Sequence, residues 1–506
     1  MDWDDRVNLD NNVSFLSWIR KYDDAREKRL TDWVSTFRRD GLPCKLTTHK
    51  RNDSRGAYNM SCKVQFENGD KWIVRFPMVG KVINADEKTE IEVATMKLIR
   101  QQTTIPIPEI RAWGLAADNT LGIGPFIMMD FIEGTSVDDI LQTPDARIMR
   151  QDISERAIEV LFRQTIDFSL QLQKLDFPHI GSLTSKSTAG RGGFTATIHS
   201  RPVTKKSHDF VLESGVNVLG PQDEIFASTT EYFHHIVDRD LQHLHDQPNS
   251  VDDERDAREK YIYFNIMKAL IPRHVLSSHG MGPFKLVCDD FQPTNMIVNN
   301  EEDLKVVAVI DWEWSYTAPA QLVNSTPRSI PRPGQFHAQS PNAWASVDER
   351  LARFQQHLEL YTRILEEEEL KILGYGITED QKPSTMLRAC QKDGRQWLHF
   401  IILRGFNGPT CVPFVKLREE TKDWDELAAA IPEEDISSFV KKKMADLQKY
   451  EEQLVEMKER YRTALNGNSK DLDEFLCQNA ETLSLDCWRY QWQSWTCFNR
   501  PSLLGE

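Results

Sequence analysis

The sequence predicts an α+β protein in which a strand-rich region precedes a much longer helical one. Two runs, residues 60–67 and 71–76, flank Asn68-Gly69, the strongest short-range signal for a β-hairpin. The apolar run 125–132 has the length and composition of a buried strand. From residue 345 onward the pattern is mostly helical. Strands gathered in one region and helices in another are typical of the α+β class.

Residues 1–42 are expected to form an N-terminal helical segment. Aromatic anchors among polar residues, such as Trp18 and Trp33, predict one or two amphipathic helices that pack on the strand-rich region next to them. In the second hairpin strand, Lys71, Ile73 and Arg75 share one face. A helix is expected over 88–101, with Glu92 on it.

A strand cation paired with a helix carboxylate is the arrangement that kinases use to hold the α- and β-phosphates of ATP. Arg75 and Glu92 are candidates for such a pair, and an ordinary surface ion pair is the alternative. Upstream, residues 54–59 include one glycine among small polar residues. They can form a turn whose amides approach phosphates, although an ordinary loop fits the same residues.

Helices are expected over 137–175 and 223–277, and loops over 184–222, which is rich in Ser, Thr and Gly. Residues 319–344 are rich in Pro and predict an extended crossing segment. A long helix over 436–465 has about four heptads of apolar residues. It fits packing on the same domain, or self-association through a coiled coil.

Three oxygen-bearing side chains follow two short apolar strands near the middle of the chain. Asp290 and Asn295 stand in Cys-Asp-Asp-Phe-Gln-Pro-Thr-Asn, and Asp311 follows the apolar run 306–310. Turn formers in a plain hairpin are the alternative. A carboxylate directly after a buried strand needs a metal or a cationic partner, however, because an unpaired buried charge is costly. Oxygen ligands suit Mg²⁺, and a carboxylate beside that metal can accept a proton from a hydroxyl.

These residues carry a resemblance. Cys-Asp-Asp-Phe-Gln-Pro-Thr-Asn-Met-Ile-Val followed by Val-Ile-Asp-Trp-Glu resembles the aminoglycoside phosphotransferase family, in its fungal branch. The resemblance implies that Asp290 is the catalytic residue and that Asn295 and Asp311 bind Mg²⁺. Cys288 departs from the pattern, because the family usually has His there. Arg75 is a second departure, since kinases generally have Lys at that position.

The resemblance also implies a bilobal, protein-kinase-like fold with ATP in the cleft between the lobes. The N-lobe would span residues 43–132, the C-lobe 133–330, and a helical extension 331–506. In the hinge between the lobes, backbone groups would bind adenine, and Met128, Met129 and Phe131 would line the pocket for the ring. The residues expected to bind ATP are Ser54, Gly56, Tyr58, Asn59, Arg75, Glu92, Met129, Asp130, Phe131 and Ile132.

The composition limits the classes of partner and the cellular compartment that are expected. The net charge is −15, which argues against nucleic acid or an anionic membrane as the main partner. No run approaches 18 apolar residues, no secretory signal precedes the first helix, and the eight cysteines lack Cys-x2-Cys spacing. A cytoplasmic protein is therefore expected.

The function expected is an ATP-dependent transfer of a phosphoryl group to a hydroxyl of a small-molecule acceptor. The alternative is a pseudokinase or ATP-binding scaffold, which Cys288, Arg75 and the single-glycine loop favour. A protein kinase lacks support, because no Asp-Phe-Gly with a following Ala-Pro-Glu is present.

Overall fold

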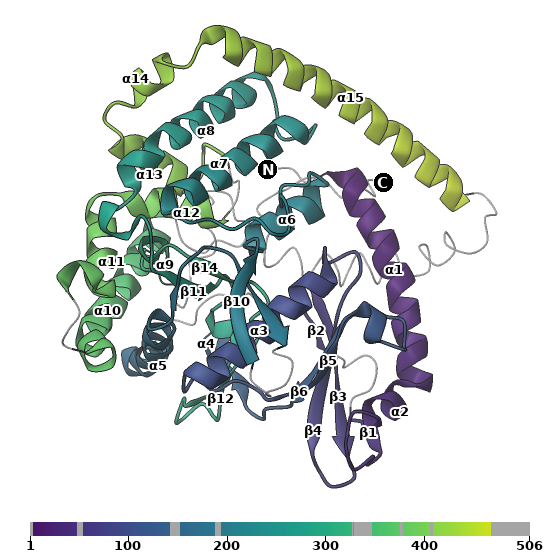
Figure 1. The fold of residues 1–506 in the computed structure, drawn as a ribbon. Helices are drawn as coiled ribbons and strands as arrows, with labels where there is room; N and C mark the ends of the chain where they lie inside the picture. The colour runs from purple at the N-terminus through teal and green to yellow at the C-terminus, as the bar shows by residue number, and fades with distance from the viewer. Residues whose placement is uncertain are drawn as a thin grey trace.

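The computed structural model describes residues 4–47, 54–141, 152–187, 194–325, 327, 347–374, 378–404 and 408–466. Figure 1 shows a sheet-containing N-terminal part and a larger helical part, so the α+β prediction is confirmed. Most of the predicted extended segment 319–344 lies outside the described residues, but residues 320–323 are described and form a helix, so the prediction is wrong there. The part of the predicted helical extension beyond residue 466 also lies outside them.

The N-terminal sheet is antiparallel, with the strand order β1-β3-β4-β6-β5 and with β2 paired to β3. Its strands are β1 (Cys44–Leu46), β2 (Ser54–Arg55), β3 (Asn59–Phe66), β4 (Lys71–Pro77), β5 (Ile110–Gly114) and β6 (Phe126–Asp130). The predicted hairpin is β3–β4. Its turn contains Gly69 at a φ of 93°, a left-handed conformation that costs glycine little.

Two groups of helices cover the two faces of this sheet. Helices α1 (Asp5–Lys28) and α2 (Leu30–Ser35) pack on one face, where Trp72, Val74 and Phe76 point. Helix α3 (Ala85–Gln102) packs on the other through residues such as Val93 and Met96. Side chains alternate along a strand, so Arg75 faces α3 and not α1.

Helix α1 also contacts the helical part of the molecule (Figure 1). The backbone N–H of Asp4 donates to the backbone oxygen of Glu213, at 3.1 Å. Asp5 N–H donates to the hydroxyl of Tyr450 at 3.1 Å, and the Arg6 guanidinium donates to Gln453 Oε1 at 2.5 Å. A single helix therefore joins the N-terminal sheet to α6 (Lys205–Ser214) and α15 (Glu433–Asn466).

Gly80 is the point where the backbone of α1 comes closest to the turn after β4. Its φ is 78°, and a Cβ there would lie 2.1 Å from the backbone oxygen of Asn11. Gly80→Ala should therefore displace α1. Gly69→Ala is a matched control, since Gly69 also has a positive φ but no atom within 4 Å of such a Cβ. We expect the control to cost about 1–2 kcal/mol of unfolding free energy from strain alone, and Gly80→Ala to cost more. Thermal unfolding of both variants measures this, and equal costs would contradict the close approach.

The helical part begins after β6, and its described residues form three small sheets. Its strands pair as β14-β11-β8, β13-β12-β7 and β10-β9. The strands are β7 (Thr135–Ser136), β8 (Asp176–Phe177), β9 (Ser182–Ser187), β10 (Phe194–Ser200), β11 (Phe284–Cys288), β12 (Met296–Val298), β13 (Val306–Val309) and β14 (Ser315–Ala318). The helices up to residue 323 are α4 (Val137–Leu141), α5 (Glu155–Gln173), α6, α7 (Thr229–Asp246), α8 (Glu254–His274) and α9 (Ala320–Val323).

The expectation of loops over 184–222 is wrong, because this region contains β9, β10 and α6. Thr204 caps the N-terminus of α6 through its side chain, and Gly215 ends the helix in a left-handed conformation. Phe210 and Leu212 are buried between these caps. Burial of these two side chains, which point to different sides of the helix, stabilises a helix that the polar composition of the region obscured.

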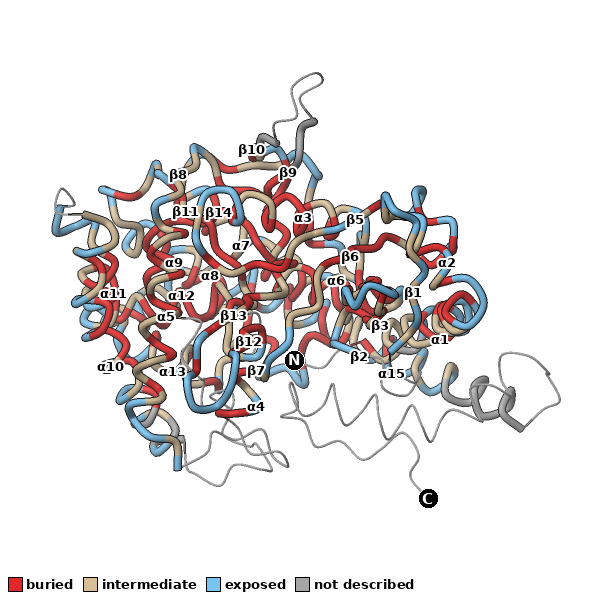
Figure 2. The backbone as a smooth tube through the Cα atoms, turned by 90° about the horizontal axis from the view of Figure 1, so that it is seen from below, coloured by how far each residue is buried: buried red, intermediate tan, exposed pale blue. Residues whose placement is uncertain are grey.

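The chain ends its described course in helices. These are α10 (Val347–Leu373), α11 (Pro383–Lys392), α12 (Arg395–Arg404), α13 (Val412–Glu420), α14 (Trp424–Ala429) and α15. Figure 2 shows buried segments running from these helices through α3 to the sheet. Ile436, Phe439 and Tyr450 of α15 are buried within the chain itself. No helix in the described ranges combines the length and apolarity needed to cross a membrane.

Candidate active site

Asp290 lies just after β11 and is held by two side-chain amides. Asn295 Nδ2 donates to Asp290 Oδ2 at 2.8 Å and to the Asp290 backbone oxygen at 2.9 Å. Gln292 Nε2 donates to Asp290 Oδ1 at 2.6 Å. Burial raises the pKa of Asp290, and Lys205 opposes that shift. The carboxylate is thus fixed in orientation by neutral donors from its own loop.

Pairing of β12 with β13 brings Asp311 to the same place. Met296 is opposite Val309, and the backbone N–H of Ile310 donates to the backbone oxygen of Asn295 at 2.9 Å. Asp311 has a φ of 62°, a left-handed conformation that aspartate tolerates better than most residues. Burial, followed by the neighbouring carboxylate of Glu313, raises the pKa of Asp311 to about 7.

Arg75 joins Asp311 to α3. Its guanidinium makes ion pairs with Asp311 Oδ1 and with Glu92 Oε1. Only 1% of the Glu92 side chain is exposed, and 10% of the Arg75 side chain. Burial opposes the charged form of Arg75, but Glu92 and Asp311 overcome it and raise the pKa of the guanidinium. The predicted contact between strand cation and helix carboxylate is therefore present and is buried.

Glu313, Lys88 and Asn59 form a second polar cluster beside this one. Lys88 Nζ makes an ion pair with Glu313 Oε2, and Asn59 Nδ2 donates to the same oxygen at 2.7 Å. Burial alone would raise the pKa of Glu313, but Lys88 and then Arg75 outweigh it, so the pKa is lowered. Neither Lys88 nor Glu313 was among the residues predicted from the sequence. The i, i+4 spacing of Lys88 and Glu92 on one helix face was the signal available for Lys88.

The residues expected in the phosphate loop have different surroundings. Gly56 is exposed, and its backbone N–H donates to the backbone oxygen of Asn59 at 2.9 Å. Ser54 pairs with Ser61 in the β2–β3 ladder. The Tyr58 hydroxyl donates to Asp209 Oδ1 on α6 at 2.9 Å. Tyr58 and Asn59 therefore both contact the helical part of the molecule.

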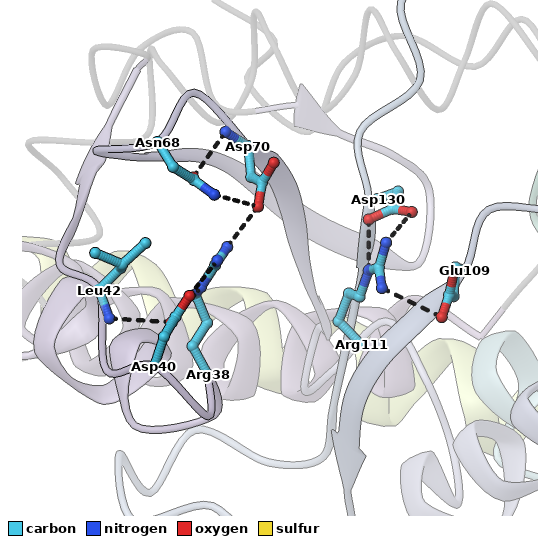
Figure 3. A network of polar contacts seen from close by, with 8 residues as sticks. All are labelled: Arg38, Asp40, Leu42, Asn68, Asp70, Glu109, Arg111 and Asp130. Carbon is cyan, nitrogen blue, oxygen red and sulfur yellow. Dashed lines mark hydrogen bonds and ion pairs between the residues drawn. The ribbon is translucent and has the colours of Figure 1, made fainter.

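The predicted hinge leaves the sheet at Asp130. Both carboxylate oxygens of Asp130 accept from Arg111, at 2.7 and 2.9 Å (Figure 3). The backbone N–H of Asp130 donates to the backbone oxygen of Glu109, and that of Phe131 donates to the backbone oxygen of Lys71, each at 3.0 Å. Within the described ranges the backbone N–H of Ile132 has no protein acceptor. The side chain of Asp130 is thus bound to Arg111, whereas the backbone N–H of Ile132 is unpaired within the described ranges.

Side chains around this hinge lie in separate environments. Met129 is buried in the core that includes α3. Met128 packs in the core beneath α1 and α2, on the opposite face of the sheet, so the expectation that it lines the same pocket is wrong. Lys63 Nζ lies 3.5 Å from the centre of the Phe131 ring.

Cys288 stands where the resembled family usually has His. Its thiol is buried and lies 3.6 Å from the backbone oxygen of Asp311. Burial raises the pKa of this thiol, which keeps it neutral and unreactive. The residue therefore links the two loops that carry Asp290 and Asp311.

The donor set fits a divalent cation. In the described structure four carboxylates lie in this region, on Asp290, Asp311, Glu313 and Glu92, and the other three add to burial in raising the pKa of Asp311. Mg²⁺ is typically bound by one or two protein oxygens together with phosphate oxygens. Among the described residues no group of three His, Cys, Asp or Glu is arranged as a metal site.

A surface pocket of about 580 Å³ lies elsewhere, beside the start of α7. Its lining includes Glu224, Phe226, His234, His235 and Asp238, none of which belongs to the clusters described above.

Comparison with known families identifies the one to which the chain is similar. The model of the family described as "APH: Phosphotransferase enzyme family" matches residues 51–321. Among solved structures, a macrolide 2'-phosphotransferase from Brachybacterium faecium is similar at 14% identity and a TM-score of 0.36, covering 80% of this chain and 98% of its own. An ethanolamine kinase from Plasmodium vivax is similar at 10% identity and a TM-score of 0.36, covering 80% and 82%. TM-scores and identities this low do not indicate which substrate this chain binds. The search of curated proteins gave no match.

Proposed function

This chain belongs to the phosphotransferase enzyme family, and on that premise we propose that it transfers the γ-phosphoryl group of ATP to a hydroxyl of a small-molecule acceptor. One observation carries the proposal. Asp290, oriented by Asn295 and Gln292, lies beside the loop in which Asp311 is paired with Arg75. Phosphoryl transfer needs such a carboxylate next to positive charge, because catalysis consists mainly of positioning and charge stabilisation.

Asp290 would orient the acceptor hydroxyl and accept its proton. Both of its oxygens already accept hydrogen bonds from neutral amides, so the direction of the carboxylate is fixed. A carboxylate has further lone pairs for a substrate hydroxyl. A positioned general base of this kind typically contributes about 10²–10⁴-fold to a rate.

Arg75 would contact the phosphates of ATP. The guanidinium has five N–H donors, and the ion pairs with Glu92 and Asp311 leave some of them for a phosphate. Glu92 would keep the guanidinium in place. The turn over 54–59 would cover the phosphates, without the N–H of Gly56, which already donates to the backbone oxygen of Asn59.

The adenine edge would meet the backbone of residues 130–132. The N–H of Ile132 supports this proposal, because it is unpaired within the described structure. Arg111 holds the Asp130 side chain, so Asp130 would contribute its backbone only. Met129 and Phe131 would flank the base.

Asn295 and Asp311 would hold Mg²⁺. The bound ion would supply positive charge that offsets the charge developing on the phosphoryl group. Asp311 would offer the ion a carboxylate whose charge Arg75 neutralises in part.

The alternative, an ATP-binding scaffold without turnover, is not favoured. Cys288 is a neutral linker between the two loops, and Arg75 makes the ion pair expected of the more usual Lys. Neither departure removes an oxygen donor from the site.

A labelling experiment tests the proposal. The purified chain is incubated with γ-labelled ATP and a set of hydroxyl compounds (amino alcohols, amino sugars, hydroxy acids and a metabolite extract), with MgCl₂ or with EDTA. We expect label on at least one acceptor with MgCl₂ and none with EDTA. Nucleotide binding with no transfer to any of these acceptors would instead support the scaffold.

Substitution of Asp311 tests the metal role, and the backbone supplies a control. Asn tolerates a positive φ and removes the charge, so Asp311→Asn should fold. We expect it to raise the Mg²⁺ concentration for half-maximal transfer by about tenfold or more, in line with the loss of one charged ligand. Asp311→Ala adds backbone strain and should also lower the melting temperature. An unchanged Mg²⁺ requirement in Asp311→Asn would exclude Asp311 as a ligand.

A further inference from the structure

The cluster of Glu313, Lys88 and Asn59 forms a closed triangle of contacts. Both Lys88 Nζ and Asn59 Nδ2 contact Glu313 Oε2, and Lys88 Nζ also donates to Asn59 Oδ1 at 3.3 Å. The proposed reaction needs no chemistry from Glu313 or Lys88.

The triangle joins three elements that are far apart in the sequence. Asn59 is the first residue of β3 and ends the phosphate loop, whereas Lys88 lies in the first turns of α3. Glu313 follows Asp311 by two residues. Helix α3 is consequently tied twice to residues 311–313, once from Lys88 to Glu313 and once from Glu92 through Arg75 to Asp311.

Stability does not explain these buried charges. The exposed fractions are 1% for the Lys88 side chain and 2% for that of Glu313. The cost of removing two charges from water often exceeds what the ion pair returns, and an apolar pair of similar volume is often as stable. What an ion pair with a shared hydrogen bond provides, and an apolar pair does not, is one defined geometry.

We propose, resting on the function above, that Glu313 is a positioning residue for phosphoryl transfer. It holds Asn59, and with it the end of the phosphate loop, at a fixed distance from Asp311. It also holds α3, and so Glu92, in the place that aims Arg75. Displacement of a reacting group by about 1 Å can cost about 10²-fold in rate, so a buried tie between the loop and the metal-binding residue has a direct effect on turnover.

Three variants test the proposal. Glu313→Gln removes the charge, Lys88→Met/Glu313→Gln removes both charges, and Asn59→Ala cuts only the tie to the loop. We expect kcat to fall roughly 10- to 100-fold in each, with a rise in KM for ATP and little change in KM for the acceptor. The double variant should recover the melting temperature that Glu313→Gln loses, because no unpaired buried charge remains, but it should not recover kcat.

Recovery of both properties in the double variant would overturn the positioning role and leave a structural one. Hydrogen exchange of the amides over 54–60 gives a readout that needs no turnover. We expect faster exchange there in Asn59→Ala and Glu313→Gln, and unchanged exchange would overturn the proposal.

Glu419→Gln/Lys416→Met is the matched control. This exposed ion pair at 2.7 Å should contribute little, and the variant should behave as wild type. Failure of the wild type to transfer phosphate to any acceptor would count against the proposed function. Wild-type turnover with unaltered kinetics in all three variants would count against Glu313 alone.

Discussion

Replacing Asp290 by Asn should lower kcat for phosphoryl transfer by about 10²–10⁴-fold, the usual contribution of a positioned general base. The change is nearly isosteric. Asn295 Nδ2 can still donate to the amide oxygen of the new side chain, and Gln292 can turn its amide so that its oxygen accepts from the new NH2 group. The loop should therefore keep its shape. What is lost is the negative charge that accepts the proton of the hydroxyl.

Nucleotide affinity separates this result from misfolding. The residues proposed to bind ATP are contributed by other elements, so the Kd for MgATP should stay close to the wild-type value. Asp252→Asn is the control, since Asp252 is exposed and lies outside the site. Equal turnover by wild type and Asp290→Asn would refute the catalytic assignment.

Replacing Arg75 by Met should destabilise the N-terminal sheet by about 3–5 kcal/mol, because it leaves Glu92 charged, buried and unpaired. The loss should be visible as faster hydrogen exchange in β3, β4 and α3, which surround the guanidinium. Transfer should also fall, because the phosphates lose their proposed contact.

The double variant Arg75→Met/Glu92→Gln separates the effect on stability from the effect on phosphoryl transfer. Removal of both charges should restore most of the stability, while transfer stays low. Arg75→Lys should lower the stability less than Arg75→Met does, because a positive charge remains beside Glu92. It replaces the forked guanidinium donor by a single ammonium group, however. Wild-type hydrogen exchange in Arg75→Met would show that the buried ion pair contributes little to the fold.

Much of the fold could be predicted because local signals agreed with tertiary structure. Asn68-Gly69 indicated the hairpin, and alternation along 71–76 indicated the face on which Arg75 lies. The spacing of Asp290, Asn295 and Asp311 placed these residues at the ends of short strands. Their roles in catalysis and metal binding remain predictions.

The rest depends on contacts across long stretches of chain. Helix α6 was missed because a polar, Ser- and Thr-rich composition hides a helix that only tertiary burial stabilises. The contact of Tyr58 with Asp209 spans 151 residues. That of Asn59 with Glu313 spans 254 residues, and no local periodicity reveals it. Met128 was assigned to the wrong environment because adjacent residues of a strand point to opposite faces.

The hydrogen bond between Asp5 and Tyr450 joins residues 445 positions apart in the chain. Helix α1 is synthesised before α6 and α15, so its first tertiary contacts are with its own sheet. Its N-terminal end can then pair with α6, through Asp4 and Glu213, and with α15 only after that helix has been made. We therefore expect the contacts between α1 and α15 to form late in folding, after closure of a long loop.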